Sequence, residues 1–114
     1  MNINVKRVKI CVTVPRDNTE DVRDAMCKAG AGTLTNSNYT YCSICSDSIG
    51  TFIPNDNAKP YIGEKNKLEV VVEHKLEVIC EIDKVKNVIA ALREAHPYEE
   101  PAIDIIPLLN EEDF

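Results

Sequence analysis

A long, nearly unbroken alternation over residues 68–80 constrains the fold more than any other feature of the sequence. This period of two predicts one β-strand with two unlike faces. A strand of this length reaches about 40 Å at roughly 3.3 Å per residue, more than one small domain covers. We therefore expect it either to bend at a bulge or to project onto a neighbouring subunit. Its apolar face is predicted to consist of Leu68, Val70, Val72, His74, Leu76, Val78 and Cys80.

The other segments predict shorter elements from hydrophobic periodicity and from Gly, Pro and Asn punctuation. The C-terminal tail over Asn110–Asp113 is acidic and is expected to be solvated and frayed. In chain order, we predict a strand over Val8–Val14 closed by Pro15, a helix from Asn18 or Thr19 to Gly30, a hairpin of Tyr39–Ser46 and Thr51–Ile53 around a turn at Asp47–Gly50, a functional or mobile loop over Pro54–Lys67, a helix from Glu81 or Asp83 to His96-Pro97, and a strand over Ala102–Ile106.

This order of elements predicts a single domain over residues 1–114 in the α+β class. Two amphipathic helices and a mostly antiparallel sheet bury their apolar stripes most economically when both helices cover one face of the sheet. We therefore predict a ferredoxin-like (βαββαβ) fold with one long strand that leaves an open edge.

Charge and cysteine usage restrict the function classes. Nineteen acidic against thirteen basic residues give a net charge of -6, which repels nucleic acid. The chain shows neither a signal peptide nor an apolar run long enough for a bilayer, so we expect a cytoplasmic protein without membrane contact. The five cysteines are an odd number and lie mostly in apolar patterns, which is typical of free thiols in a reducing compartment.

Two motifs carry a family resemblance: AGAG at residues 29–32 followed by NYTYCS at 38–43, and HPYEEPA at 96–102 followed by Asp104-Ile105. GTFIP at 50–54, PYIG at 60–63 and the acidic residues Glu69, Glu73 and Glu77 support it. Together they resemble the NGG-interacting-factor-three-like (YqfO-like) family, in the free-standing form of its inserted CutA/PII-like domain. The resemblance implies a ferredoxin-like fold and a homotrimer with ligand clefts between subunits.

The same resemblance also sets limits. Full-length members carry a dinuclear metal site in flanking domains, built from several His and carboxylate residues. This chain contains only two histidines, His74 and His96, so we expect that site and its hydrolase chemistry to be absent. The motif at residues 38–43 places Tyr39 and Cys42 among the candidate ligand-binding residues.

His96, Glu99 and Glu100 form the strongest candidate site. An imidazole and two carboxylates within five residues can bind a divalent cation or move a proton, which makes His96 and Glu99 candidate metal ligands. The alternative is structural: Pro97 ends the helix, Tyr98 packs, and the carboxylates form ion pairs across a subunit boundary. If the segment lines a cleft between subunits, it can have the binding role and the structural role at once.

Other candidate residues favour structural roles. Cys42 and Cys45 have redox or zinc spacing, but residues three apart on a strand point to opposite faces. His74 is expected to be a hydrogen-bonded core or interface residue, and the glycines at 30 and 32 are explained by helix termination.

Three functions remain open. The first is a non-enzymatic oligomeric binding or sensing module for a small ligand or a divalent metal, with subunit interfaces lined by His96, Tyr98, Glu99, Glu100, Tyr39 and Cys42. The second is a small enzyme in which His96 serves as a general base. The third is an adaptor that binds another polypeptide by strand addition.

Overall fold

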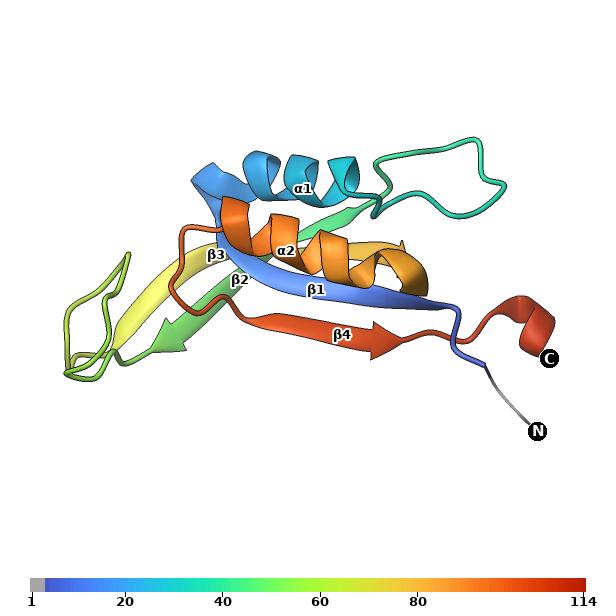
Figure 1. Cartoon of the computed structure of the whole chain (residues 1–114). Helices are drawn as coiled ribbons and strands as arrows, with labels where there is room; N and C mark the ends of the chain where they lie inside the picture. Colours follow the sequence, from blue (N-terminus) through green and yellow to red (C-terminus); the bar gives the residue numbers. More distant parts are fainter. Residues whose placement is uncertain (1–3) are drawn as a thin grey trace.

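The computed structural model describes residues 4–114, which form one four-stranded antiparallel sheet and two α-helices (Figure 1). The strands lie in the order β2-β3-β1-β4. This arrangement confirms the predicted ferredoxin-like fold, and a short 3₁₀ turn precedes each α-helix. The elements are β1 (Arg7–Pro15), α1 (Thr19–Lys28), β2 (Ile44–Phe52), β3 (Glu69–Glu81), α2 (Val85–Ala95) and β4 (Ile103–Pro107), with 3₁₀ turns at Arg16–Asn18, Ile82–Lys84 and Glu111–Asp113.

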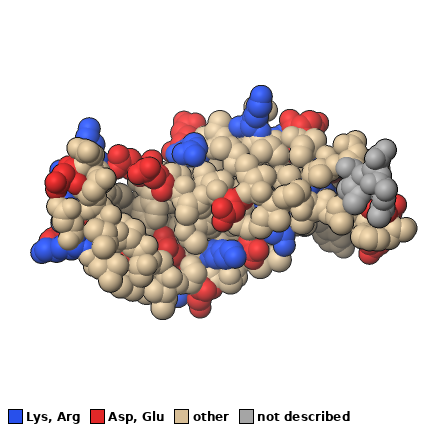
Figure 2. Space-filling model, turned by 90° about the horizontal axis from the view of Figure 1, so that it is seen from below, with Lys and Arg blue, Asp and Glu red and all other residues tan. Residues whose placement is uncertain are grey.

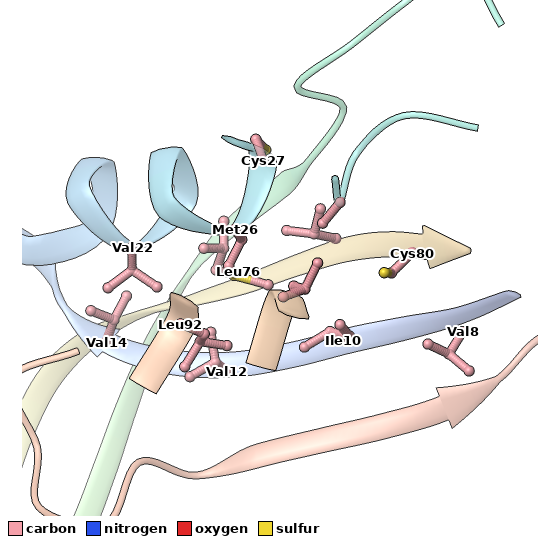
Figure 3. Packing of buried hydrophobic residues seen from close by; sticks show 13 residues of the cluster. Val8, Ile10, Val12, Val14, Val22, Met26, Cys27, Leu76, Cys80 and Leu92 are labelled. Carbon is pink, nitrogen blue, oxygen red and sulfur yellow. The ribbon is translucent and has the colours of Figure 1, made fainter. Parts of the chain in front are cut away.

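Both helices cover one face of the sheet, as the apolar stripes predict (Figure 1). The core lies between the two layers, where Val22 and Met26 of α1 and Leu92 of α2 meet the strands (Figure 3). Alternate side chains of β1 and the second half of β3 supply the sheet side of this core: Val8, Ile10, Val12, Val14, Leu76, Val78 and Cys80.

The long strand β3 projects past the core without a bulge in its pairing. Residues 73–81 pair with β1 and residues 69–77 pair with β2, both in continuous register, so the first part of β3 pairs with β2 alone. The predicted open edge is confined to residues 69–72 and 78–81 of this strand, because residues 73–77 have a paired strand on each side. The projection gives a radius of gyration of 15.7 Å, against about 13 Å for a compact domain of this length.

The predicted hairpin around Asp47–Gly50 is also wrong. The segment continues as strand β2, and its turn-forming residues pair with β3, with Ser48 opposite Glu73 and Gly50 opposite Val71. The strand begins later than predicted because Tyr41 has a positive φ of 58°, which interrupts extended backbone. Ladder hydrogen bonds to a long partner strand therefore outweigh the local turn preference.

The buried face of β3 changes sides along its length. Leu76 is fully buried beneath the helices, but Val70 and Val72 on the same face are 57% and 52% exposed because no helix reaches them. On the projecting half, the opposite face is buried instead, at Val71 and Glu73. Within one chain, the predicted apolar face of residues 68–80 is therefore buried only over its second half, and the covered reverse face of the first half becomes the floor of a cavity.

The end of α1 and the C-terminal tail both have defined structure. Gly30 has a φ of 118° and the Ala31 N–H donates to the Met26 carbonyl, so α1 ends at the glycine expected to terminate it. The acidic tail, predicted to fray, forms a 3₁₀ turn in which the buried Asn110 donates its N–H to Asp113 Oδ2 at 2.7 Å.

Candidate functional site

A cavity of about 490 Å³ lies where the projecting β2–β3 ribbon meets the loop over residues 54–67 and the segment that follows α2. Figure 2 shows a hollow at the end of the molecule that carries this loop, with acidic side chains at its edge. The floor is the sheet face that the helices leave uncovered, because Thr13, Ser48 and Glu73 all point away from the core side. Tyr98, Glu99 and Glu100 of the predicted site line its wall.

Glu73 and Tyr98 form a hydrogen-bonded pair at the floor of the cavity. The Tyr98 hydroxyl donates to Glu73 Oε2 at 2.8 Å, and Glu73 is only 5% exposed. Burial raises the pKa of Tyr98, and the hydrogen bond to Glu73 raises it further, so this hydroxyl remains a donor at physiological pH. None of the ion pairs among residues 4–114 involves Glu73.

Tyr98 is the centre of an aromatic cluster. Its ring lies 6.4 Å from Phe52 and 6.3 Å from Tyr61, measured between centroids, with tilted planes. Phe52 ends β2 and Tyr61 belongs to the long loop, so Tyr98 joins three separate segments around the cavity. Tilted pairs at these distances are favourable aromatic contacts.

His96 is buried and both of its ring nitrogens are engaged. Nε2 donates to the Thr13 carbonyl at 2.8 Å, and Nδ1 accepts the Tyr98 N–H at 3.1 Å. Desolvation lowers the pKa of His96, which favours the neutral ring that this pattern requires. The arrangement anchors the segment after α2 to β1 and leaves no ring nitrogen for a metal or a substrate proton, so it supports the structural alternative.

Glu99 ties the long loop to the segment after α2. Its Oε2 accepts the backbone N–H of Lys59 at 2.8 Å, whereas Glu100 is exposed at the cavity wall. Across residues 4–114, no group of three or more His, Cys, Asp or Glu side chains is placed to hold a metal ion. The donor set of one chain therefore does not fit a chelated divalent metal at His96 and Glu99.

Tyr39 and Cys42 lie away from this cavity. Both belong to the loop before β2, while the cavity lies at the far end of that strand (Figure 1). Cys42 and Cys45 are exposed free thiols, and Tyr39 is 74% exposed. One chain thus does not unite the two halves of the predicted site.

His74 is hydrogen-bonded, as expected for a lone imidazole on a strand. Its Nδ1 lies 2.8 Å from Thr19 Oγ1, and its Nε2 lies 3.6 Å from Asp47 Oδ1. Asp47 in turn pairs with Arg16 at 3.1 Å. These contacts join β2 and β3 to the start of α1 and are distinct from the cavity.

Sequence reasoning missed three residues of the cavity floor: Glu73, Ser48 and Gly50. In the sequence, Glu73 is one of three acidic residues on the long strand, and Ser48 and Gly50 fall in the predicted turn. Their shared signal is the β2–β3 register, which places Ser48 directly opposite Glu73. If residues 47–50 are taken as a continuation of the strand instead of a turn, this register places all three residues on or beside the same sheet face.

Among residues 4–114, no helix is long and apolar enough to cross a membrane. No protein-family model matches the chain. A GTP cyclohydrolase 1 type 2 homolog from Halalkalibacterium halodurans is 45% identical over 103 residues, which are 90% of this chain and 27% of that protein. The solved structure of a Bacillus cereus protein related to NIF3 superposes with a TM-score of 0.80 at 37% identity, covering 96% of this chain and 27% of that one.

The chain matches one segment of proteins of the NGG-interacting-factor-three-like (YqfO-like) family, which confirms the predicted resemblance. It spans about a quarter of the length of these YqfO-like relatives. The divalent ion tolerance protein CutA1 from Ehrlichia chaffeensis superposes with a TM-score of 0.68 at 13% identity, covering 97% of this chain and 91% of that one. This likeness concerns the fold alone and confirms the predicted CutA-like architecture.

Proposed function

We propose that the chain is a non-enzymatic, homo-oligomeric module that binds a small ligand in the cavity beside Glu73 and Tyr98. The observation that carries this proposal is the cavity itself, about 490 Å³ with a buried carboxylate at its floor. Small-molecule sites typically enclose about 300–1,000 Å³ and combine apolar walls with a few placed polar groups. Phe52 and Tyr61 supply such walls, and Glu73 with Tyr98 supplies the polar groups.

An enzyme that uses His96 as general base fits the geometry less well. Both nitrogens of that ring already bond to backbone groups, so a substrate proton has no acceptor there. The donor set of residues 4–114 likewise favours a small organic ligand over a divalent metal, although two CutA proteins of similar fold are named for tolerance of divalent ions.

The projecting ribbon supports a homo-oligomer. Its helix-side face carries four exposed apolar side chains, and Ile49 pairs directly with Val72. Contiguous exposed apolar residues mark protein interfaces. Further copies of this chain can cover them, because most soluble oligomers consist of identical subunits related by closed rotational symmetry. We propose a homotrimer, as the family resemblance implies, in which a neighbour brings Tyr39 and Cys42 towards the cavity. The exposed fractions are 63% for Leu68, 57% for Val70, 52% for Val72 and 72% for Ile49.

Light scattering tests the assembly. We expect three times the mass of one chain at micromolar concentration, and a lower mass for Val72→Lys, which charges the proposed interface. Ile82→Lys is the matched control, because Ile82 is also half exposed but follows β3 at its other end. A wild-type mass equal to one chain contradicts the homo-oligomer.

A thermal-shift screen of metal-stripped protein tests ligand binding, because a ligand of the native state raises the melting temperature by mass action. We expect at least one amine, nucleotide or metal to give a saturable shift that Ala58→Phe abolishes by filling the cavity. Ala90→Phe, on the exposed side of α2, is the matched control and leaves the shift intact. A screen without any shift, combined with a stoichiometric protein partner from native lysate, contradicts the ligand proposal and favours strand addition at β2 or β4.

A further inference from the structure

We infer that the cavity selects an organic cation, namely an ammonium or guanidinium group carried on an apolar or aromatic body. This inference deepens the proposed function and rests on it. It specifies the chemical class of the ligand from the charges, the unpaired polar atoms and the rings that surround the cavity.

The charged lining of the cavity is entirely acidic. Glu73, Glu99 and Glu100 line it, and the lining contributed by residues 4–114 contains no Lys, Arg or His. Three carboxylates in a partly enclosed space concentrate a negative potential. This potential opposes phosphates and carboxylates and attracts a positive group.

Glu73 lacks a counter-charge. The residue is 95% removed from solvent, its Oε2 accepts only the Tyr98 hydroxyl, and the ion pairs of residues 4–114 do not include it. Buried carboxylates are normally paired, because burial of an isolated charge is costly. A bound cation supplies the missing partner.

Two residues of β2 shape the position of this carboxylate. Ser48 lies directly opposite Glu73 in the strand pairing, and its Oγ is buried without a hydrogen-bond partner among the described residues. That hydroxyl can accept an N–H of a ligand that pairs with Glu73. Gly50 leaves the space that Glu73 occupies, since a Cβ there would clash with Glu73 Oε1.

Aromatic rings complete the recognition of a cation. Tyr98 contacts Phe52 and Tyr61 around the cavity, at centroid distances of 6.4 and 6.3 Å. A ring face attracts an ammonium or guanidinium group placed within about 6 Å of its centroid. The same rings offer an apolar surface to the body of an organic ligand, which a bare metal ion would leave uncovered.

Calorimetric titration with two organic cations and their matched anions tests the inference. The cations are tyramine and benzamidine, and the matched anions are 3-(4-hydroxyphenyl)propionate and benzoate. We expect the wild-type protein to bind at least one cation and to bind its matched anion at least tenfold more weakly. Glu73→Gln keeps the side-chain shape and should weaken cation binding by about tenfold or more, as for loss of a charged hydrogen-bond partner.

Two variants make the result specific to the site. Glu77→Gln is the matched control, because Glu77 lies on the same face of β3 but outside the cavity, and it should leave the affinity unchanged. Tyr61→Leu removes an exposed ring without disturbing the core and should weaken cation binding several-fold. Circular dichroism of each variant establishes that it is folded.

Two results overturn the inference. One is that no cation binds the wild-type protein while an anion or nucleotide does so in the cavity, which leaves the binding function standing and refutes the ligand class. The other is equal cation affinity of the wild-type protein and a folded Glu73→Gln variant. If no compound of either charge binds, the proposed function fails together with the inference.

Discussion

Replacing Tyr98 by phenylalanine isolates the hydrogen bond at the floor of the cavity. The phenylalanine ring preserves the contacts with Phe52, Tyr61 and His96 and removes only the hydroxyl that donates to Glu73 at 2.8 Å. Because Glu73 is 5% exposed, water cannot freely replace the lost donor. The carboxylate oxygen is then left buried and unpaired.

The expected cost follows from that unpaired oxygen. Leaving a buried acceptor unsatisfied costs about 1–3 kcal/mol, and hydrogen bonds to charged groups fall towards the upper end of that range. The bond is only partly buried, so we expect a loss of about 1.5–2.5 kcal/mol in the free energy of unfolding. In urea, this loss appears as a lower midpoint with an unchanged m-value.

Urea unfolding at one fixed protein concentration measures this loss. Tyr61→Phe is the matched control, because the Tyr61 side chain is 59% exposed and should lose less than about 0.5 kcal/mol. A double-mutant cycle with Glu73→Gln should give a coupling energy of about 1 kcal/mol or more. Additive losses, or equal effects of the two Tyr→Phe changes, would refute the reasoning.

Three further predictions concern the walls of the cavity. Burial lowers the pKa of His96, so below about pH 6.5 the unfolded chain binds a proton that the folded chain does not. The free energy of unfolding should therefore fall as the pH drops from that value towards the pKa of His96 in the folded protein. His96→Gln should reduce this pH dependence in urea titrations at several pH values. Glu99→Gln weakens the tether to the Lys59 N–H and should speed tryptic cleavage after Lys65 in the same loop, with less than about 0.5 kcal/mol lost globally; an unchanged cleavage rate argues against the tether. Gly50→Ala should cost about 1–3 kcal/mol by overpacking against Glu73, and an unchanged urea midpoint would show that the carboxylate moves freely.

Much of the fold follows from periodicity within single segments. The alternation that predicts β3 and the stripe that ends at Gly30 depend on local sequence, and both elements form as expected. The false turn at Asp47–Gly50 has the opposite origin, because its residues become extended only through pairing with a strand about 25 residues away, as Ser48 does with Glu73. Such pairing is not encoded in local turn preference.

The candidate site divides in the same way. Tyr98, Glu99 and Glu100 are recognisable as a compact motif and do line the cavity. Glu73 is not recognisable, because its burial depends on a loop and a segment that close over the sheet from other parts of the chain. The alternation of β3 shows which residues lie on the same strand face as Glu73. It does not show that the long loop and the segment after α2 cover that face.

The central claim, that this cavity is the ligand site, is tested most directly by mapping amide chemical-shift changes in two-dimensional NMR spectra during titration with whichever compound stabilises the protein. We predict that the largest changes cluster at Glu73, Tyr98 and residues 58–62, which surround the cavity. Saturable changes confined to α1 and α2, with the cavity signals unmoved, would contradict the account.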